Sequence, residues 1–550
     1  MPEIVENVDK PEDYYGIDLD GVLSELGEFG KFQKIIYFLT FLPVILDSCL
    51  CMSYIFTTAQ VDYRCKIPEC DKNVTEYTPI WLENVVPFQH NEPEKCMRYS
   101  TNMYSNSSIR QCSGDGFDNT KRIKCDEFVY KTNEVTILNE FNLTCRENEW
   151  KLTLIGTVKN TAELIMLPIS GMLSDRFGRR TMLICAFSLT GTLGILISFS
   201  WNYWMFASLE FATALLTSGS YMSVFILGME LVGKNKRVLG GAVISMIFSF
   251  GQIFLGVAAM YAMNFRILLR ILYSLALVTV SYIWVIPESF RWLLSKGRNK
   301  EAVDILFKAA RVNKVELSSS TVHALNKCAE SNGTNLPTHS KTLSVLSVRS
   351  KRLFLRLANC CFCWFTMGFV YYGLSVQSVA LGGNKFANFI WISVSEVPAC
   401  IISYFLMDRA GRKITLSSTM ILAGIFCFAY EFIPAEAIFL RIFMFFISKC
   451  AISISFSVTY VYTTELFPTN LRQGLMGICA ACGYIGSMTA PQTPLLARLM
   501  PSLPVILFGG ISMLSGSLVL FLPETFNTNL PDTIAEAKNI GRTKQIETIT

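Results

Sequence analysis

The sequence is dominated by apolar runs of about twenty residues, each long enough to cross the hydrocarbon core of a bilayer as a helix. Of the 550 residues, 51% are hydrophobic and only 17% are charged, whereas soluble proteins carry about 25% charged residues. The chain is therefore predicted to be an all-α polytopic membrane protein. Membrane-spanning helices are expected at residues 32–58, 151–173, 181–199, 203–228, 238–262, 266–286, 352–375, 387–407, 413–432, 438–462, 474–497 and 503–522.

Lysine and arginine gather in alternate loops, which predicts the orientation of the chain. The loops after the second, fourth, sixth and eighth spans contain DRFGRR, KNKR, FRWLLSKGRNK and DRAGRK, whereas the loops between them are nearly free of basic residues. Basic loops stay in the cytoplasm, so both termini are expected there, with the protein in the plasma membrane. The expected parts are a cytoplasmic N-terminus (1–31), an N-terminal six-helix half (32–286), a cytoplasmic linker (287–351), a C-terminal six-helix half (352–522) and a cytoplasmic tail (523–550).

The segment 60–150, between the first two spans, is expected to be extracellular and stabilised by disulfides. It contains an even number of cysteines, which favours a disulfide framework outside the cell, although the pairing stays open. These cysteines are Cys65, Cys70, Cys96, Cys112, Cys125 and Cys145. Three Asn-x-Ser/Thr sequons in the same segment, at Asn73, Asn106 and Asn142, are predicted glycosylation sites. The loop is also a candidate surface for homo-oligomer formation.

The linker contains one amphipathic run, NKEAVDILFKAARVNK, in which Ala302, Ile305, Leu306 and Ala309 share a helical face. The chain contains neither a glycine-rich phosphate loop nor a Cys/His spacing typical of metal sites, and it has three histidines in all. No enzyme activity, cofactor, metal or nucleic-acid partner is predicted.

The strongest evidence for the architecture is that three cytoplasmic motifs occur twice in the same order. LSDRFGRRT returns as LMDRAGRKI, MELVGKNKR as TELFPTNLR, and PESF as PETF, at lags of 233, 235 and 236 residues. This repetition indicates a duplicated six-span unit. Two parallel halves of this kind place a substrate site at their interface near the middle of the bilayer.

The charged residues of the repeated motifs are candidate gating residues. They are Asp175, Arg179, Glu230, Arg237, Asp408, Arg412, Glu465 and Arg472. We expect Glu230 to pair with Arg237 and Glu465 with Arg472, and to separate as one half rocks against the other. A role as loop anchors and topology signals is the alternative.

These motifs resemble those of the major facilitator superfamily. GMLSDRFGRR is similar to its G-x-L-x-D-R-x-G-R-R signature, and PESFRWLLSKGR to a signature shared by sugar carriers and the organic cation/anion/zwitterion transporter family. The cysteine-rich loop, EFNLTC, CWFTMGFVYYGLS and SKCAISISFSVTYVYTTELFPTNLRQ resemble the second branch, and the likeness runs from about residue 26 to residue 535. It implies a major facilitator fold of twelve helices in two pseudo-symmetric halves. It also implies secondary transport of small organic ions by alternating access, with a coupling ion as one option.

The resemblance also implies which residues line the substrate cavity. The positions that match are Tyr221, Phe248, Trp364, Tyr371, Glu396, Lys449 and Tyr484. Aromatic faces attract organic ammonium groups, and ionisable residues within a span are functional candidates by default. Ordinary packing is the alternative for each aromatic residue.

Tyr484 departs from the family pattern, because cation carriers commonly have Asp and anion carriers Arg at this position. Four more ionisable residues fall within predicted spans: Asp47, Lys159, Glu163 and Glu210. Lys159 and Glu163, four residues apart, are expected to neutralise each other, and Asp47 is a candidate for the missing anionic contact. Organic cations or zwitterionic amines are favoured as substrates, with organic anions as the alternative. A sugar carrier and a non-transporting receptor are less favoured.

Overall fold

A computed structural model describes residues 19–540, apart from residue 28 and residues 72–75, 90–91, 102–111, 113–115, 231–236, 331–350 and 435. Beyond residue 526 it also leaves out 527, 529–530, 532–535 and 538–539. The predicted sequons Asn73 and Asn106 lie outside the described residues.

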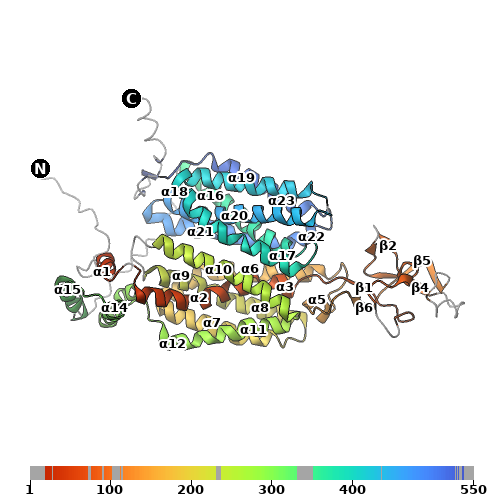
Figure 1. Cartoon of the computed structure of the whole chain (residues 1–550), viewed down its shortest axis with the longest axis horizontal. Helices are drawn as coiled ribbons and strands as arrows, with labels where there is room; N and C mark the ends of the chain where they lie inside the picture. The colour runs from red at the N-terminus through yellow and green to blue at the C-terminus, as the bar shows by residue number, and fades with distance from the viewer. Residues whose placement is uncertain are drawn as a thin grey trace, which may run out of the picture.

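The transmembrane bundle consists of two groups of helices lying side by side (Figure 1). The first group contains α2 (Lys31–Met52), α3 (Tyr54–Thr57), α6 (Glu149–Phe177), α7 (Arg179–Ile197), α8 (Tyr203–Thr217), α9 (Ser220–Glu230), α10 (Arg237–Ala262), α11 (Phe265–Val278) and α12 (Tyr282–Val285). The second contains α16 (Lys351–Ser378), α17 (Lys385–Val394), α18 (Glu396–Ala410), α19 (Arg412–Glu431), α20 (Ile438–Leu466), α21 (Thr469–Thr489), α22 (Thr493–Leu496) and α23 (Leu503–Val519). We call these groups the N half and the C half.

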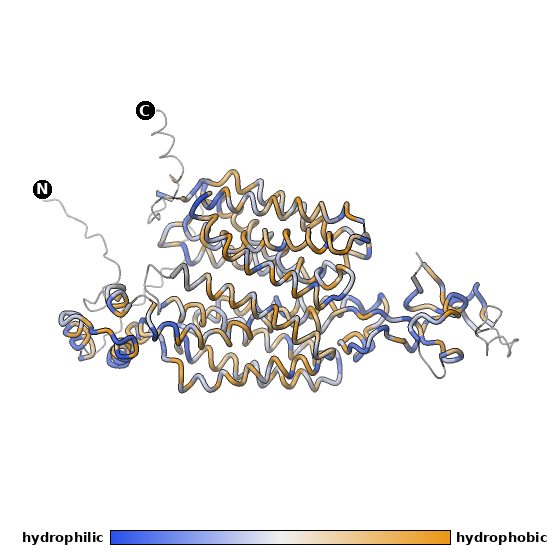
Figure 2. Tube along the Cα trace, in the orientation of Figure 1, coloured by the Kyte–Doolittle hydropathy of each residue, from blue (hydrophilic) through white to orange (hydrophobic). Residues whose placement is uncertain are grey.

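Every predicted span falls on a helix of the bundle. In the described part of the chain, ten continuous helical stretches are long and apolar enough to cross a membrane, and α23 is a shorter apolar helix. Figure 2 shows hydrophobic residues along the length of the bundle and more hydrophilic segments beyond both ends. Large apolar side chains such as Trp284, Phe439 and Phe521 are at least 79% exposed. Such side chains on the outside of a protein indicate a membrane-facing surface.

One end of the bundle carries a domain formed by the residues between α3 and α6, which we call the disulfide domain. It contains three two-stranded antiparallel sheets that the all-helical prediction did not include. Their strands are β1 (Tyr63–Cys65), β2 (Phe88–Gln89), β3 (Glu92–Pro93), β4 (Met97–Thr101), β5 (Phe117–Lys124) and β6 (Phe128–Tyr130). The predicted disulfides are confirmed, and they pair Cys65 with Cys125, Cys70 with Cys112, and Cys96 with Cys145. The sequon residue Asn142 is exposed.

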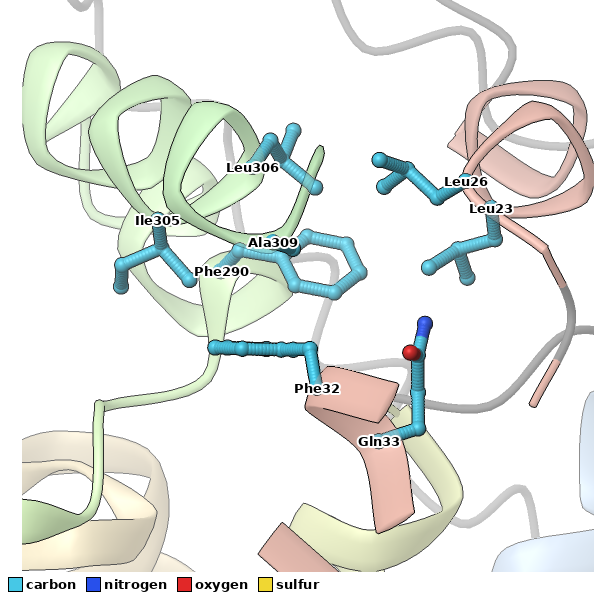
Figure 3. Close-up of a pocket in the computed structure, with 8 residues that line it drawn as sticks. All are labelled: Leu23, Leu26, Phe32, Gln33, Phe290, Ile305, Leu306 and Ala309. Atoms are coloured by element: carbon cyan, nitrogen blue, oxygen red, sulfur yellow. The ribbon is translucent and has the colours of Figure 1, made fainter. Parts of the chain in front are cut away.

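The opposite end of the bundle, which we call the linker end, carries α1 (Leu19–Glu25), α13 (Phe290–Ser295), α14 (Asn299–Asn313) and α15 (Ser319–Glu330). The amphipathic run of the linker forms α14. Its buried Leu306 and Ala309 face Leu23 and Leu26 across a small pocket (Figure 3). The Asn313 side chain also accepts a hydrogen bond from the Phe32 amide at 2.7 Å and donates one to the Leu26 carbonyl at 2.8 Å. These contacts join the linker to the first residues of the N half.

Candidate functional site

The repeated motifs come together in space at the start of α7. Gly178 separates α6 from α7 with φ +98°, a conformation that glycine adopts without a Cβ clash. The Glu288 carboxylate lies against this glycine and accepts hydrogen bonds from the amides of Arg179 and Arg180 at 2.9 and 3.0 Å. A carboxylate at a helix N-terminus binds amides that have no partner in the helix and is stabilised by the helix dipole. The glycine of one motif therefore makes room for the glutamate of another.

The same arrangement recurs at the start of α19 in the C half. Gly411 has φ +83°. The Glu524 carboxylate accepts from the amides of Arg412 and Lys413 at 3.0 and 3.1 Å. A Cβ at Gly411 would lie 2.8 Å from a Glu524 oxygen, so a larger residue would displace the carboxylate. The duplication inferred from the sequence is thus also a duplication of local structure.

A second set of charges surrounds the Arg179 side chain. Its guanidinium lies 2.8 Å from Asp175 and 3.9 Å from Glu230. Glu230 also accepts a hydrogen bond from the Ser289 hydroxyl. Three of the repeated motifs therefore meet at one arginine in the N half.

The C half repeats this cluster around Arg412. Its guanidinium lies 3.9 Å from Asp408 and 3.2 Å from Glu465. The Thr525 hydroxyl donates to Glu465 at 2.6 Å, where Ser289 donates to Glu230 in the other half. Each cluster ties together the helix ends of its own half at the linker end.

The pairings expected between residues seven apart stay predictions. The Arg237 side chain lies outside the described part of the structure. Arg472 donates to the Phe467 carbonyl at 3.4 Å. Glu230 contacts Arg179, and Glu465 contacts Arg412.

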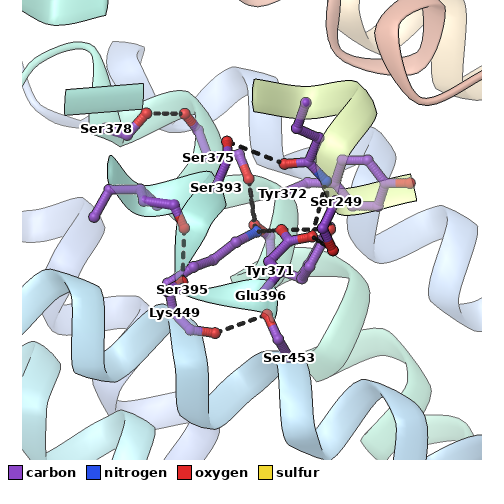
Figure 4. A network of polar contacts seen from close by, with 12 residues as sticks. Ser249, Tyr371, Tyr372, Ser375, Ser378, Ser393, Ser395, Glu396, Lys449 and Ser453 are labelled. Atoms are coloured by element: carbon purple, nitrogen blue, oxygen red, sulfur yellow. Dashed lines mark hydrogen bonds and ion pairs between the residues drawn. The ribbon is translucent and has the colours of Figure 1, made fainter. Parts of the chain in front are cut away.

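A buried network of polar side chains lies within the bundle (Figure 4). The Lys449 ammonium on α20 lies 3.1 Å from the Glu396 carboxylate at the start of α18, and both side chains are at most 5% exposed. The Tyr371 hydroxyl on α16 donates to the same carboxylate at 2.7 Å. Lys449 also donates to the Ser375 hydroxyl at 2.8 Å and lies 3.2 Å from the centroid of the Tyr371 ring. Charges inside a bilayer pair in this way because an isolated charge there is costly.

This network crosses from the C half into the N half through α10. The Gln252 amide donates to the Glu396 carboxylate at 3.1 Å and to the Tyr371 hydroxyl at 2.8 Å. The Ser249 hydroxyl donates to the same Glu396 oxygen as Gln252, at 3.2 Å. Sequence reasoning missed both α10 residues. Their signal in the sequence is a row of three polar residues, Ser245, Ser249 and Gln252, on one face of a mainly apolar span.

The predicted cavity aromatics fall into two groups. In the N half, the Tyr221 ring packs edge-on against Phe248 with centroids 5.8 Å apart. In the C half, the Trp364 ring packs against Tyr460 at 4.4 Å, and Trp364 is 2% exposed. Tyr484 is half-buried on α21, and within the described residues its side chain takes no part in the hydrogen bonds of the Glu396 network. The structure thus brings Tyr371, Glu396 and Lys449 together and places Tyr484 apart from them.

A second buried charge pair lies within the N half. Lys159 on α6 is 3.8 Å from Glu210 on α8, with the side chains 5% and 0% exposed. The expectation that Lys159 is neutralised by Glu163, one turn along the same helix, misses this partner on another helix. The Asp47 carboxylate on α2 accepts a hydrogen bond from the Ser220 hydroxyl on α9 at 3.1 Å.

The two halves are joined by hydrogen bonds at the end that carries the disulfide domain. On α6, Thr153 contacts Gln492 at 3.0 Å, Thr157 donates to the Met488 carbonyl at 3.1 Å, and Asn160 donates to the Ser487 carbonyl at 3.2 Å. This side of the bundle is closed by direct contact between α6 and the end of α21.

Comparison with known proteins decides the family. Residues 132–491 match the model of the Major Facilitator Superfamily. The chain belongs to this superfamily. It is 31% identical over 532 residues to the Organic cation transporter protein of Drosophila melanogaster, and the match covers 95% of each chain. It is 29% identical over 542 residues to the Organic cation/carnitine transporter 2 of Homo sapiens, with 96% of each chain covered.

Solved structures confirm the fold. The inward-open conformation of the xylose transporter XylE from E. coli aligns with a TM-score of 0.56 at 16% identity, covering 74% of this chain and 93% of that one. The predicted major facilitator fold and the organic-ion branch are thus confirmed. The chain is a multi-pass membrane protein and a secondary transporter, and it is not an enzyme.

Proposed function

We propose that this protein transports organic cations, including zwitterionic amines, across the plasma membrane by alternating access. The observation that carries the proposal is the Glu396–Lys449–Tyr371 network of the C half, which Gln252 joins to the N half by a hydrogen bond. A substrate site between the halves is what a major facilitator carrier requires. The relatives named for organic cations and carnitine support the choice of substrate class.

The orientation follows from the charges of the loops. The basic motifs around Arg179 and Arg412 lie at the linker end, which supports the proposal that this end faces the cytoplasm, together with both termini. The disulfide domain is then extracellular, where disulfides persist and glycosylation at Asn142 is accessible. The hydrogen bonds between α6 and α21 close the extracellular side.

The predicted gating residues and the predicted cavity residues have different roles in the proposed transport cycle. The clusters around Arg179 and Arg412 hold the cytoplasmic helix ends, and their contacts change when the cytoplasmic side closes. The aromatic and charged residues within the bundle line the substrate path. We also propose that transport is coupled to the movement of an ion and that the protein self-associates through the disulfide domain.

Uptake into cells that express the chain tests this function. Saturable uptake of labelled tetraethylammonium and choline, blocked by an excess of unlabelled amine, is the expected result. Uptake per molecule of surface protein, quantified by biotinylation, should fall in the Glu396→Gln variant. Saturable uptake of an organic anion such as para-aminohippurate, with none of the amines, would replace the proposal by the anion alternative. No saturable flux of either class from a surface-expressed protein would overturn it.

A further inference from the structure

The ionisable side chains within the two halves differ in their charge balance. In the C half, the Glu396 carboxylate is paired with the Lys449 ammonium and accepts three further hydrogen bonds. In the N half, the central turns of helices α2, α6 and α8, away from the charged helix ends, carry one ammonium, Lys159, and three carboxylates. These carboxylates are Asp47, Glu163 and Glu210. This central part of the N half therefore has an excess of acidic groups, whereas the Glu396–Lys449 pair of the C half is balanced.

The Lys159 ammonium already has partners within the N half. Besides the ion pair with Glu210, it donates to the Ser53 hydroxyl at 3.0 Å and to the Leu50 carbonyl. These contacts place its ammonium between α2 and α8. The remaining carboxylates, Asp47 and Glu163, form no ion pair within the described residues.

Asp47 and Glu163 also have few hydrogen-bond partners. Asp47 accepts one hydrogen bond, from Ser220. No side-chain hydrogen bond to the Glu163 carboxylate is present among the described residues. Both residues are half-buried, so their side chains are not sealed into the packing of the N half. A carboxylate inside a membrane protein that lacks a cation and hydrogen-bond donors is a site for a ligand of opposite charge.

The surroundings of the two carboxylates place them at the interface of the halves. The contacts of α6 with α21 of the C half run antiparallel, since Thr157 donates to the Met488 carbonyl and Asn160 to the Ser487 carbonyl. Glu163, about one turn after Asn160, is therefore level with Tyr484, about one turn before Ser487. The Asp47 carboxylate is bonded to Ser220, the chain neighbour of Tyr221. Both acids thus lie near tyrosines, whose rings attract organic ammonium groups.

A buried hydroxyl without a partner lies beside the same stretch of α6. The Tyr54 side chain is 2% exposed, and its hydroxyl has no hydrogen-bond partner within the described residues. Its ring packs against Gly156 on α6, and its chain neighbour Ser53 accepts from Lys159, one turn from Glu163. Buried hydroxyls in proteins nearly always have a partner, so this hydroxyl is available to a bound molecule.

We propose that Asp47 and Glu163 form the cation-binding subsite of this carrier, with Tyr221 and Tyr484 packing against the bound ammonium or guanidinium group. This inference rests on the proposed function and names its substrate class more narrowly. Because Lys449 is committed to Glu396 and Lys159 to Glu210, neither ammonium is free to bind a substrate carboxylate. The carrier therefore prefers simple organic cations to zwitterions, whose carboxylate would meet two acidic side chains.

Choline and glycine betaine test this preference, because both carry a trimethylammonium group and only betaine carries a carboxylate. Initial uptake rates of both, and of tetraethylammonium, are measured in cells, with surface protein quantified by biotinylation. Wild type should take up choline with at least about tenfold higher Vmax/KM than betaine. Asp47→Asn and Glu163→Gln should each raise the KM for choline and tetraethylammonium by about tenfold or more, which is the effect of losing one charge-assisted contact. Asp47→Glu, which keeps the charge, should retain most of the uptake.

Asp304→Asn is the matched control, because it removes an exposed carboxylate from α14 at the linker end. It should transport like wild type. If wild type carries neither tetraethylammonium nor choline, the proposed function itself fails. If wild type carries them and the surface-expressed Asp47→Asn/Glu163→Gln variant does so with unchanged KM, the subsite alone is refuted. Equal wild-type Vmax/KM for choline and betaine would also refute it.

Discussion

Removing either member of the Glu396–Lys449 pair should destabilise the protein more than removing both. Glu396 accepts from Lys449, Tyr371, Gln252 and Ser249 at 3.1, 2.7, 3.1 and 3.2 Å. Lys449→Met leaves an ionised carboxylate with three neutral donors. Breaking one partner of a buried ion pair costs about 3–5 kcal/mol. The three remaining donors place this variant at the lower end of that range, near 3 kcal/mol.

Glu396→Gln leaves the Lys449 ammonium with the Ser375 hydroxyl and the Tyr371 carbonyl, at 2.8 and 3.1 Å. Because no carboxylate is left to balance the buried ammonium, the stability lost by Glu396→Gln should lie nearer the upper end of this range, at about 5 kcal/mol. The double variant contains no uncompensated charge. Removing both charges of a buried pair costs less than breaking the pair, so its loss should stay below about 3 kcal/mol, less than that of either single variant.

Thermal unfolding of the purified protein in detergent, followed by tryptophan fluorescence, ranks the four proteins. The expected order of melting temperature is wild type, the double variant, Lys449→Met and then Glu396→Gln. A Glu396→Asp variant, which keeps the charge, should melt above Glu396→Gln. If the double variant melts below either single variant, the two side chains do not act as a compensated pair.

Three further predictions concern the turns and the disulfide domain. Gly178→Ala should cost about 1–3 kcal/mol because it forces a side chain to positive φ beside a carboxylate, whereas Gly171→Ala, whose added Cβ meets nothing within 4 Å, should melt at or above the wild-type temperature. Cys70→Ser should lower the melting temperature by removing the bridge to Cys112, at a cost of about 2–5 kcal/mol. Peptide mapping without reductant should show that bridge in wild type. Asn142→Gln should remove one glycosidase-sensitive increment of mass on a gel, and an unchanged mobility would exclude this residue as an acceptor.

The architecture was predictable because the bilayer leaves few alternatives. A chain that buries its backbone in hydrocarbon must form helices of a fixed length, so the apolar runs predicted the spans. The repeated motifs predicted the two halves, and the structure shows that motifs far apart in the chain contact each other within each half. Gly178 and Glu288 are 110 residues apart, yet they form one contact at the start of α7.

The partners of the buried charges were less predictable, because they lie on other helices. Lys159 is one helical turn from Glu163, but its ion pair is with Glu210 on α8. Likewise, Glu396 and Lys449 stand out as ionisable residues in apolar runs, whereas the Gln252 contact depends on how α10 crosses α18. Spacing along one helix describes neighbours on that helix only, so contacts between helices require the packed structure.

The attachment of the disulfide domain has a consequence for detecting conformational change. Its base is bonded to the N half, where Glu140 pairs with Arg266 at 2.9 Å and the Val135 amide binds the Met263 carbonyl at 2.9 Å. It also reaches the C half, where Glu134 pairs with Lys385 at 2.5 Å. If the domain stays with the N half when the carrier opens outward, the Glu134–Lys385 contact breaks. An antibody whose epitope spans the exposed Asn133 and Asn384, which lie next to these two residues in the chain, would then bind only the outward-closed protein, and so would both report the transport state on living cells and arrest the cycle from outside.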